Sequence, residues 1–80
     1  MLIRENSLYL GWLAEDYILL NEIDLAAEIA TRVLELRSRA NSARIDELLR
    51  HLARPLTWYK DVQAVTGFLD QYEDQTRFRE

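Results

Sequence analysis

Cysteine is absent from this 80-residue sequence, and the chain contains only two glycines and a single proline. Without cysteine it can form neither disulfides nor thiolate metal sites, which is typical of proteins that work in a reducing cytoplasm. The chain has few of the glycines and prolines that form turns between strands. Apolar residues make up 49% of the sequence, which is enough to form a core. This composition favours a single helical domain, which we expect to be cytoplasmic.

Long apolar runs and an excess of positive charge are missing as well. The longest apolar run, residues 8–14, ends at Glu15 and Asp16, whereas a membrane span needs about 20 apolar residues. The formal net charge of -4 opposes binding to a phosphate backbone. Residues 32–54 are rich in arginine, but the acids among them indicate a solvated helix face. We therefore expect no membrane insertion and no direct nucleic-acid binding by this segment.

The sequence also lacks motifs for catalysis or metal binding. His51 is the only histidine, and a metal site needs several converging ligands. Glu47 lies one helical turn before His51 and could orient its ring, but one such pair does not make a site. Neither glycine belongs to a phosphate-binding loop, and no serine stands in a G-x-S-x-G elbow. The chain is therefore not expected to be an enzyme or to hold a metal or cofactor.

Apolar residues recur at spacings of three and four in separate segments, which predicts an all-α fold with four helices. The predicted helices span residues 6–20, 22–37, 42–54 and 61–74. Asn21 tolerates the left-handed conformation that ends a helix, so it should end the first one. Residues 37–42 form a polar connector in which Asn41 or Ser42 can cap the third helix. Pro55 should end that helix and begin a loop over residues 55–60.

The first two helices are expected to form a tight antiparallel hairpin. The inner side of the first helix is predicted to consist of Leu10, Leu13, Ala14, Tyr17 and Leu20. The second helix should turn Ile23, Ala26, Ile29 or Ala30, and Val33 toward it, because the small alanine side chains allow a close approach, and Ala27 should lie nearer the solvent side. The third and fourth helices would form a second hairpin. Residues 1–74 would then be one module, followed by a frayed polar tail at 75–80.

The apolar spacing in the first hairpin follows a known repeat motif. The pattern is Leu10-x-x-Leu13-Ala14-x-x-Tyr17, then Ala26, Ala30 and Val33-Leu34-Glu35-Leu36. It resembles one tetratricopeptide repeat (TPR), a helix-turn-helix unit of about 34 residues. Leu10 stands where the motif prefers Trp, and Ala14 where it prefers Gly. The resemblance implies two antiparallel hairpins with TPR-like right-handed stacking.

A longer series of motifs covers residues 8 to 72. It consists of Tyr9-Leu10-x-Trp12-Leu13-Ala14, Glu22-Ile23-x-x-Ala26, Val33-Leu34-Glu35-Leu36, Ser42-Ala43-Arg44-Ile45 and Val62-x-x-Val65-x-x-Phe68-Leu69. The series resembles the C-terminal helical-repeat region of actinobacterial helix-turn-helix (XRE-type) transcription regulators. In that family a DNA-binding domain precedes the repeats, and none is recognisable in these 80 residues. We therefore expect a segment of such a regulator or a stand-alone relative.

The first helix has more apolar surface than one hairpin can bury. A second stripe on it consists of Leu8, Trp12, Glu15 and Leu19. One interpretation is that this stripe packs on an upstream helix or on the later helices, as repeats do when they stack. The other is that it is a seam for a partner or for self-association as a homodimer.

Two further surfaces are candidates for binding a protein or peptide. One is the concave side of the first and third helices, formed by Glu15, Ile18, Leu19, Asp46 and Arg50. The other is an aromatic anchor made by Trp58 and Tyr59, since aromatic side chains are common at interface hot spots. More often such residues close over a small core, and this is the interpretation that we favour for them.

The leading hypothesis is a non-catalytic, TPR-like module of a transcription regulator that binds a protein or peptide and dimerises. A stand-alone adaptor or antitoxin-like inhibitor is the first alternative. A peptide-sensing module, which would use the concave face, is the second.

Overall fold

The computed structural model consists of helices, and no strand occurs in the residues that it describes, 3–40 and 43–77. The elements are α1 (Ile3–Leu19), α2 (Ile23–Ala40), α3 (Ala43–Leu56), the short 3-10 helix η1 (Thr57–Tyr59) and α4 (Gln63–Arg77). Side-chain surroundings are described for residues 9–37 and 43–75. The predicted all-α class with four helices is confirmed.

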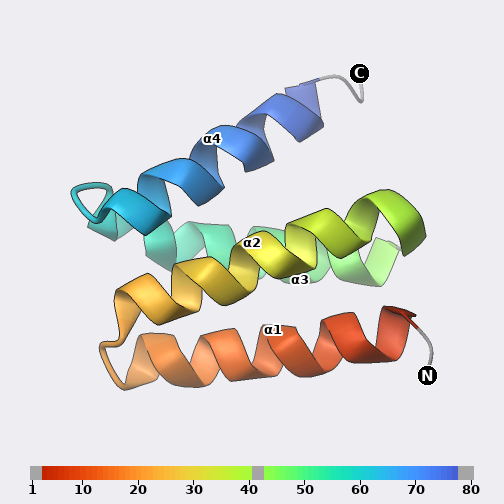
Figure 1. The fold of residues 1–80 in the computed structure, drawn as a ribbon, viewed down its shortest axis with the longest axis horizontal. Coiled ribbons are helices and arrows are strands. Elements are labelled where there is room, and N and C mark those ends of the chain that lie inside the picture. The colour runs from red at the N-terminus through yellow and green to blue at the C-terminus, as the bar shows by residue number, and fades with distance from the viewer. Residues whose placement is uncertain (1–2, 41–42, 78–80) are drawn as a thin grey trace.

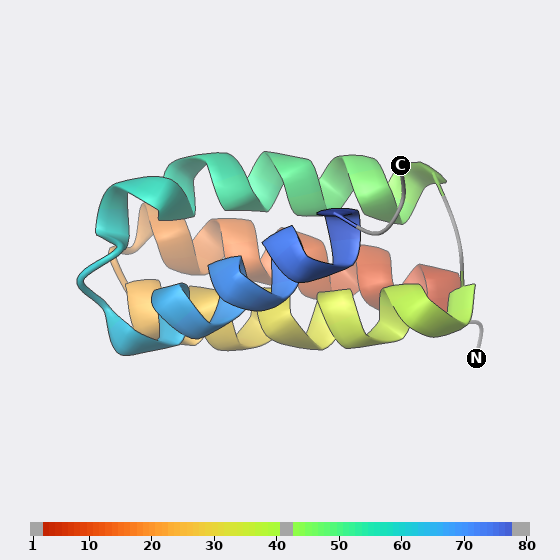
Figure 2. The same ribbon diagram turned by 90° about the horizontal axis from the view of Figure 1, so that it is seen from above.

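Helix α2 is the central element. It packs against α1, α3 and α4, and α1 also contacts α3. Helix α4 lies mainly against α2 and makes little contact with α3, so the closely packed second hairpin predicted for the third and fourth helices is not seen. Consecutive helices run in opposite directions, and α1 and α4 lie on opposite sides of α2 and α3 (Figure 1). From above, α4 lies over α2 and α3 (Figure 2). The Cα trace measures 29 × 28 × 15 Å, so it is about two helices deep and each outer helix keeps one side in solvent.

The turn between α1 and α2 depends on Asn21, as predicted. Its φ is 64°, and it is the only non-glycine residue with a positive φ in the described part of the chain. The amide of Asn21 donates to the carbonyl of Ile18 (3.0 Å), and the amide of Glu22 donates to that of Tyr17 (2.8 Å). These two bonds form a Schellman motif, which satisfies carbonyls at the end of α1 and reverses the chain into α2.

Small side chains line α2 where it meets its neighbours. Ala26, Ala27 and Ala30 are all fully buried, together with Val33 and Leu34. The expectation that Ala27 faces solvent is therefore wrong. A hairpin alone would bury one side of α2, but this helix has neighbours on three sides, and the resulting buried arc includes Ala27.

The inner side of α1 is narrower than predicted. Ala14 is fully buried, Leu10 and Tyr17 pack against the core as half-buried residues, and Leu13 is also half-buried. Leu20 is 69% exposed, so its predicted inward position is wrong. Its amide still donates to the carbonyl of Asp16 (3.0 Å), so its side chain lies one helical turn beyond Asp16 on the exposed side of α1.

Pro55 does not end α3, contrary to the prediction. The helix continues to Leu56, which is fully buried like Leu52. Proline removes one backbone hydrogen bond, and in the last turn this loss is offset by burial of the side chains on either side of it. The hydroxyl of Thr57 also donates to the carbonyl of Ala53 (2.8 Å), so η1 follows directly where a loop was predicted.

The other three helices also extend beyond their predicted bounds, and α1 begins at Ile3 instead of residue 6. Helix α2 extends to Ala40 through the first part of the expected connector. Helix α4 extends to Arg77, so residues 75–77 of the predicted frayed tail are helical, and residues 78–80 lie outside the described part. The proposed caps Asn41 and Ser42 lie outside the described residues. Within α4 the buried side is formed by Val65, Phe68 and Leu69, and these three residues hold the helix against the core.

Candidate binding groove between α1 and α3

Helices α1 and α3 meet at Gly11, which is buried. A Cβ atom added there would lie 2.2 Å from Cδ2 of Leu48. The space that a larger side chain at residue 11 would need is therefore filled by Leu48 of α3. The two helices run in the same direction (Figure 1). The C-terminal halves of both helices therefore lie at the same end of the molecule.

One turn beyond this contact, Glu15 of α1 reaches His51 of α3. The His51 Nε2 lies 3.2 Å from Glu15 Oε2, and the two side chains are 74% and 38% exposed. At such exposure a polar contact of this kind contributes about 0 to 1 kcal/mol to stability. Its main effect is to orient two polar side chains at the edge of the space between the helices.

Past this pair, α1 and α3 leave a groove with a volume of about 520 Å³. The groove is lined by Glu15, Ile18, Leu19, Glu47, Arg50, His51, Leu52, Arg54 and Pro55. The buried Leu52 lies at its base, with Ile18 and Pro55 half-buried beside it. Arg50 and Arg54 are exposed cations one turn apart. An apolar base with a few charged groups around it is a common form of binding site.

The structure brings most of the predicted concave face together. Glu15, Ile18, Leu19 and Arg50 line the groove, and Asp46 does not. Sequence reasoning missed the part of the groove that Pro55 contributes, because the proline was expected to end the helix. It also paired His51 with Glu47 of its own helix, since local spacing carries no signal for the contact with Glu15.

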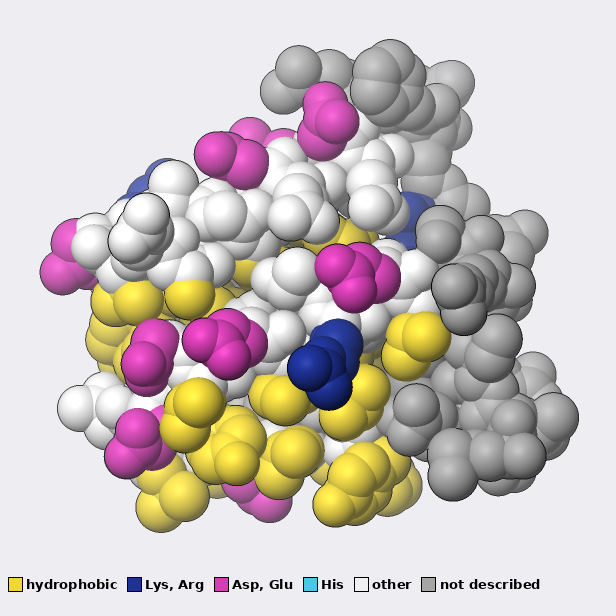
Figure 3. Space-filling model, viewed as in Figure 1, with side chains coloured by type: hydrophobic (Ala, Val, Ile, Leu, Met, Phe, Trp, Pro, Cys, Tyr) yellow, Lys and Arg dark blue, Asp and Glu magenta, His cyan; other side chains and the backbone are white. Residues whose placement is uncertain are grey.

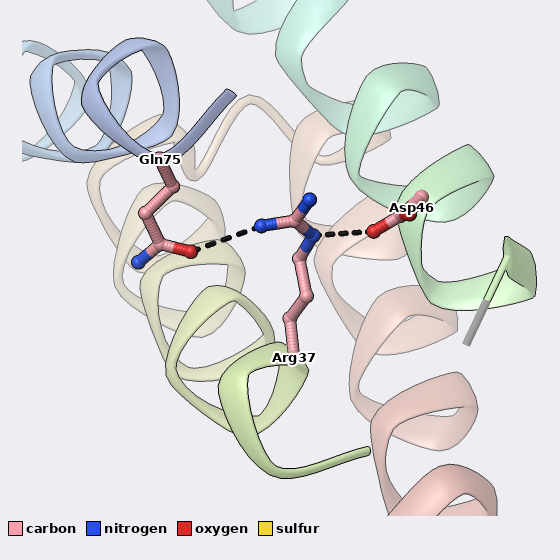
Figure 4. Close-up of polar contacts among 3 residues, drawn as sticks. All are labelled: Arg37, Asp46 and Gln75. Carbon is pink, nitrogen blue, oxygen red and sulfur yellow. Dashed lines mark hydrogen bonds and ion pairs between the residues drawn. The ribbon is translucent and has the colours of Figure 1, made fainter. Parts of the chain in front are cut away.

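Asp46 lies instead in a polar cluster that joins three helices (Figure 4). The Nε of Arg37, on α2, donates to Oδ1 of Asp46, on α3. The Nη1 of Arg37 donates to Oε1 of Gln75, on α4, over 3.2 Å. The Arg37 side chain is only 10% exposed. This cluster fixes the relative positions of α2, α3 and α4 and is not part of the groove.

The predicted stripe on α1 is divided between two environments. Trp12 and Leu19 are exposed, whereas Glu15 is turned toward His51. The side chain of Leu8 lies outside the described residues. Hydrophobic side chains gather over α1 and the adjoining part of α2 (Figure 3). Among the residues 9–37 and 43–75, the later helices therefore do not cover Trp12 and Leu19.

Trp58 and Tyr59 lie in η1 and have different surroundings. Trp58 is 82% exposed, whereas Tyr59 is half-buried and packs against the core. The favoured interpretation, that both close over a small core, is therefore wrong for Trp58. The 3-10 turn places these neighbours about 120° apart around its axis, so only one of them can face inward.

The described residues hold no group of three or more His, Cys, Asp or Glu side chains that could bind a metal ion. Among the described helices, none combines the length and the apolar character that crossing a membrane requires. The comparison with protein-family models, curated proteins and solved structures found no match for this chain. The functional argument therefore depends on the groove and on the exposed surfaces.

Proposed function

We propose that this chain is a non-catalytic, TPR-like module that binds a protein or peptide in the groove between α1 and α3, as part of a cytoplasmic transcription regulator. The groove is the observation that carries the binding proposal. It combines an apolar base with exposed arginines and a glutamate, so an extended or helical peptide could place an apolar side chain on Leu52 and an acidic one beside Arg50 or Arg54.

Helix contacts support the repeat-like part of the proposal. Helix α3 lies against both helices of the first hairpin, and α4 lies against α2. A second repeat stacked on a first would make these contacts between repeats, because each repeat buries its apolar face on its neighbour. The contact between α3 and α4 within the second pair is slight by comparison. The right-handed sense of stacking and the regulator assignment come from the resemblance of the sequence.

Selection from a random peptide library displayed on phage tests the binding function directly. The complete 80-residue chain serves as bait, and affinities of enriched peptides are measured for the wild type, Arg50→Glu and Arg32→Glu. Arg32 is an exposed arginine of α2 outside the groove, so it is the matched control. We expect Arg50→Glu to weaken binding about tenfold or more and Arg32→Glu to leave it unchanged.

Two results would contradict peptide binding in the groove. One is that no peptide is enriched over an unrelated bait, and the other is that both charge reversals have equal effects. The regulator assignment has a separate test, which is to sequence the transcript that encodes the chain. A helix-turn-helix domain in the same reading frame supports the assignment, and a reading frame without any DNA-binding domain overturns it.

A further inference from the structure

The outer side of α1 carries four large apolar side chains that stay mostly uncovered. Tyr9 is 60%, Trp12 62%, Leu19 84% and Leu20 69% exposed. Asp16, also exposed, lies among them. Residues three, four and seven apart share one side of a helix, so these five form a continuous face, here called the outer α1 face. A face that exposes four large apolar side chains around one charged group marks an interaction site.

The outer α1 face is chemically different at its two ends. Its N-terminal half carries rings with polar tips, Tyr9 and Trp12, and its C-terminal half carries Leu19 and Leu20. Trp12 has an indole N–H to donate, and Asp16, one turn later, has a carboxylate to accept. The donor and the acceptor therefore lie on either side of the middle of the face.

We infer that the outer α1 face binds the same face of a second copy of this chain, with the two α1 helices antiparallel. In that orientation the Trp12 indole donates to Asp16 of the second copy, and the reverse contact forms through the two-fold axis. The rings at one end then pack on the leucines at the other. A parallel pairing would set Asp16 beside its own copy, where like charges repel.

The available surface suits a dimer of weak affinity. A standard interface buries about 800 Å² per partner, and two rings and two leucines at these exposures supply roughly half to two thirds of that area. Interfaces below the standard size belong to weak or transient complexes, so a dissociation constant in roughly the micromolar range is expected. This inference is independent of the groove, except that Leu19 borders both surfaces.

Sedimentation equilibrium of the complete chain tests the dimer. The wild type, Trp12→Glu and the matched control Trp58→Glu are compared from about 1 μM to 1 mM, which brackets the expected dissociation constant. Trp58 is also an exposed tryptophan, but it lies on η1. We expect the mass of the wild type and of Trp58→Glu to rise to that of two chains and to stop there. Trp12→Glu should raise the dissociation constant about tenfold or more.

Orientation is tested with single cysteines, since the chain has no others. In the antiparallel dimer the two copies of residue 16 are offset by about 6 Å along the helix axis, and the two copies of residue 20 by about 18 Å. Both substitutions lie in the contact, so each variant is cross-linked at a concentration where sedimentation shows the same fraction of dimer. Asp16→Cys should then cross-link with a short bis-maleimide much faster than Leu20→Cys. Cross-linking of both at the same rate indicates parallel helices and overturns the antiparallel arrangement.

A wild type that stays monomeric at 1 mM overturns the dimer. So does a Trp12→Glu variant that associates as strongly as the wild type. Loss of association in Trp58→Glu but not in Trp12→Glu would also overturn it. Growth beyond two chains excludes a closed two-fold contact. Circular dichroism of each variant checks that it is folded. Because none of these measurements involves a peptide, failure of the dimer and failure of the groove are distinguishable.

Discussion

Arg37 of α2 and Asp46 of α3 form a hydrogen-bonded ion pair in which the arginine side chain is 10% and the aspartate side chain 28% exposed. The same guanidinium donates to Gln75 of α4. One nearly buried cation therefore joins the three helices that follow the α1–α2 turn. A planar guanidinium can do this because its donors point in fixed, separate directions.

Arg37→Met should lower the free energy of unfolding by about 1 to 3 kcal/mol, because it keeps the apolar stem of the side chain but removes both hydrogen bonds. Arg32→Met, at an exposed site of the same helix, should change it by less than about 0.5 kcal/mol. Urea denaturation at one fixed protein concentration measures both. Equal midpoints for the two variants, at unchanged slope, would show that the Arg37 cluster does not stabilise the fold.

Local sequence patterns predicted those features of the fold that depend on a single helix or turn. The apolar periodicity predicted the number of helices, and Asn21 predicted the turn between α1 and α2, because a left-handed residue is a local requirement. The error at Pro55 has a tertiary cause. Local chemistry ends a helix at proline, but burial of Leu52 and Leu56 in this fold outweighs one lost hydrogen bond.

The candidate site was predictable only in part, for a similar reason. Helical spacing identified Glu15 and Ile18 on the side of α1 that faces α3, and the structure places both in the groove. The contact of Glu15 with His51 joins residues on two helices, and no periodicity within one helix encodes it. Arg37 likewise lay in a segment that composition marked as a connector, so its burial could not be inferred.

Ala26 and Ala27 are both fully buried, so a larger side chain at either position should destabilise the chain. Ala26→Leu and Ala27→Leu should each lower the free energy of unfolding, by about 1 to 3 kcal/mol, since both insert three carbon atoms into filled space. Ala43→Leu is the matched control, because Ala43 is exposed on α3, and its effect should stay below about 0.5 kcal/mol. If only Ala26→Leu were destabilising in thermal or urea unfolding, Ala27 would have to face solvent.

The left-handed conformation of Asn21 makes this position sensitive to branching at Cβ. Asn21→Val should lower the free energy of unfolding by about 1 to 2 kcal/mol, because a branched side chain collides with the backbone at positive φ. Asn21→Gly should be neutral or slightly stabilising, since glycine adopts this conformation without strain. Urea midpoints of the two variants provide the check, and a neutral Asn21→Val would contradict the Schellman turn.

The two glycines of the chain are both helical, and they should respond to alanine in opposite ways. Gly67 is exposed, and an added Cβ would meet no atom within 4 Å. Gly67→Ala should therefore raise the free energy of unfolding by about 0.5 to 1 kcal/mol, the difference in helix propensity. At Gly11 the same gain is opposed by overlap with Leu48, which costs about 1 to 3 kcal/mol.

Gly11→Ala should consequently leave the chain at least about 1 kcal/mol less stable than Gly67→Ala. The overlap is with one side chain, so removing that side chain should remove the penalty. In a Leu48→Ala background, Gly11→Ala should become stabilising to about the same extent as Gly67→Ala. Urea denaturation of the four chains in this double-mutant cycle measures the coupling between residues 11 and 48. A Gly11→Ala effect that is the same in both backgrounds would mean that α3 does not approach α1 at Gly11, and the groove beyond that contact would have a different shape.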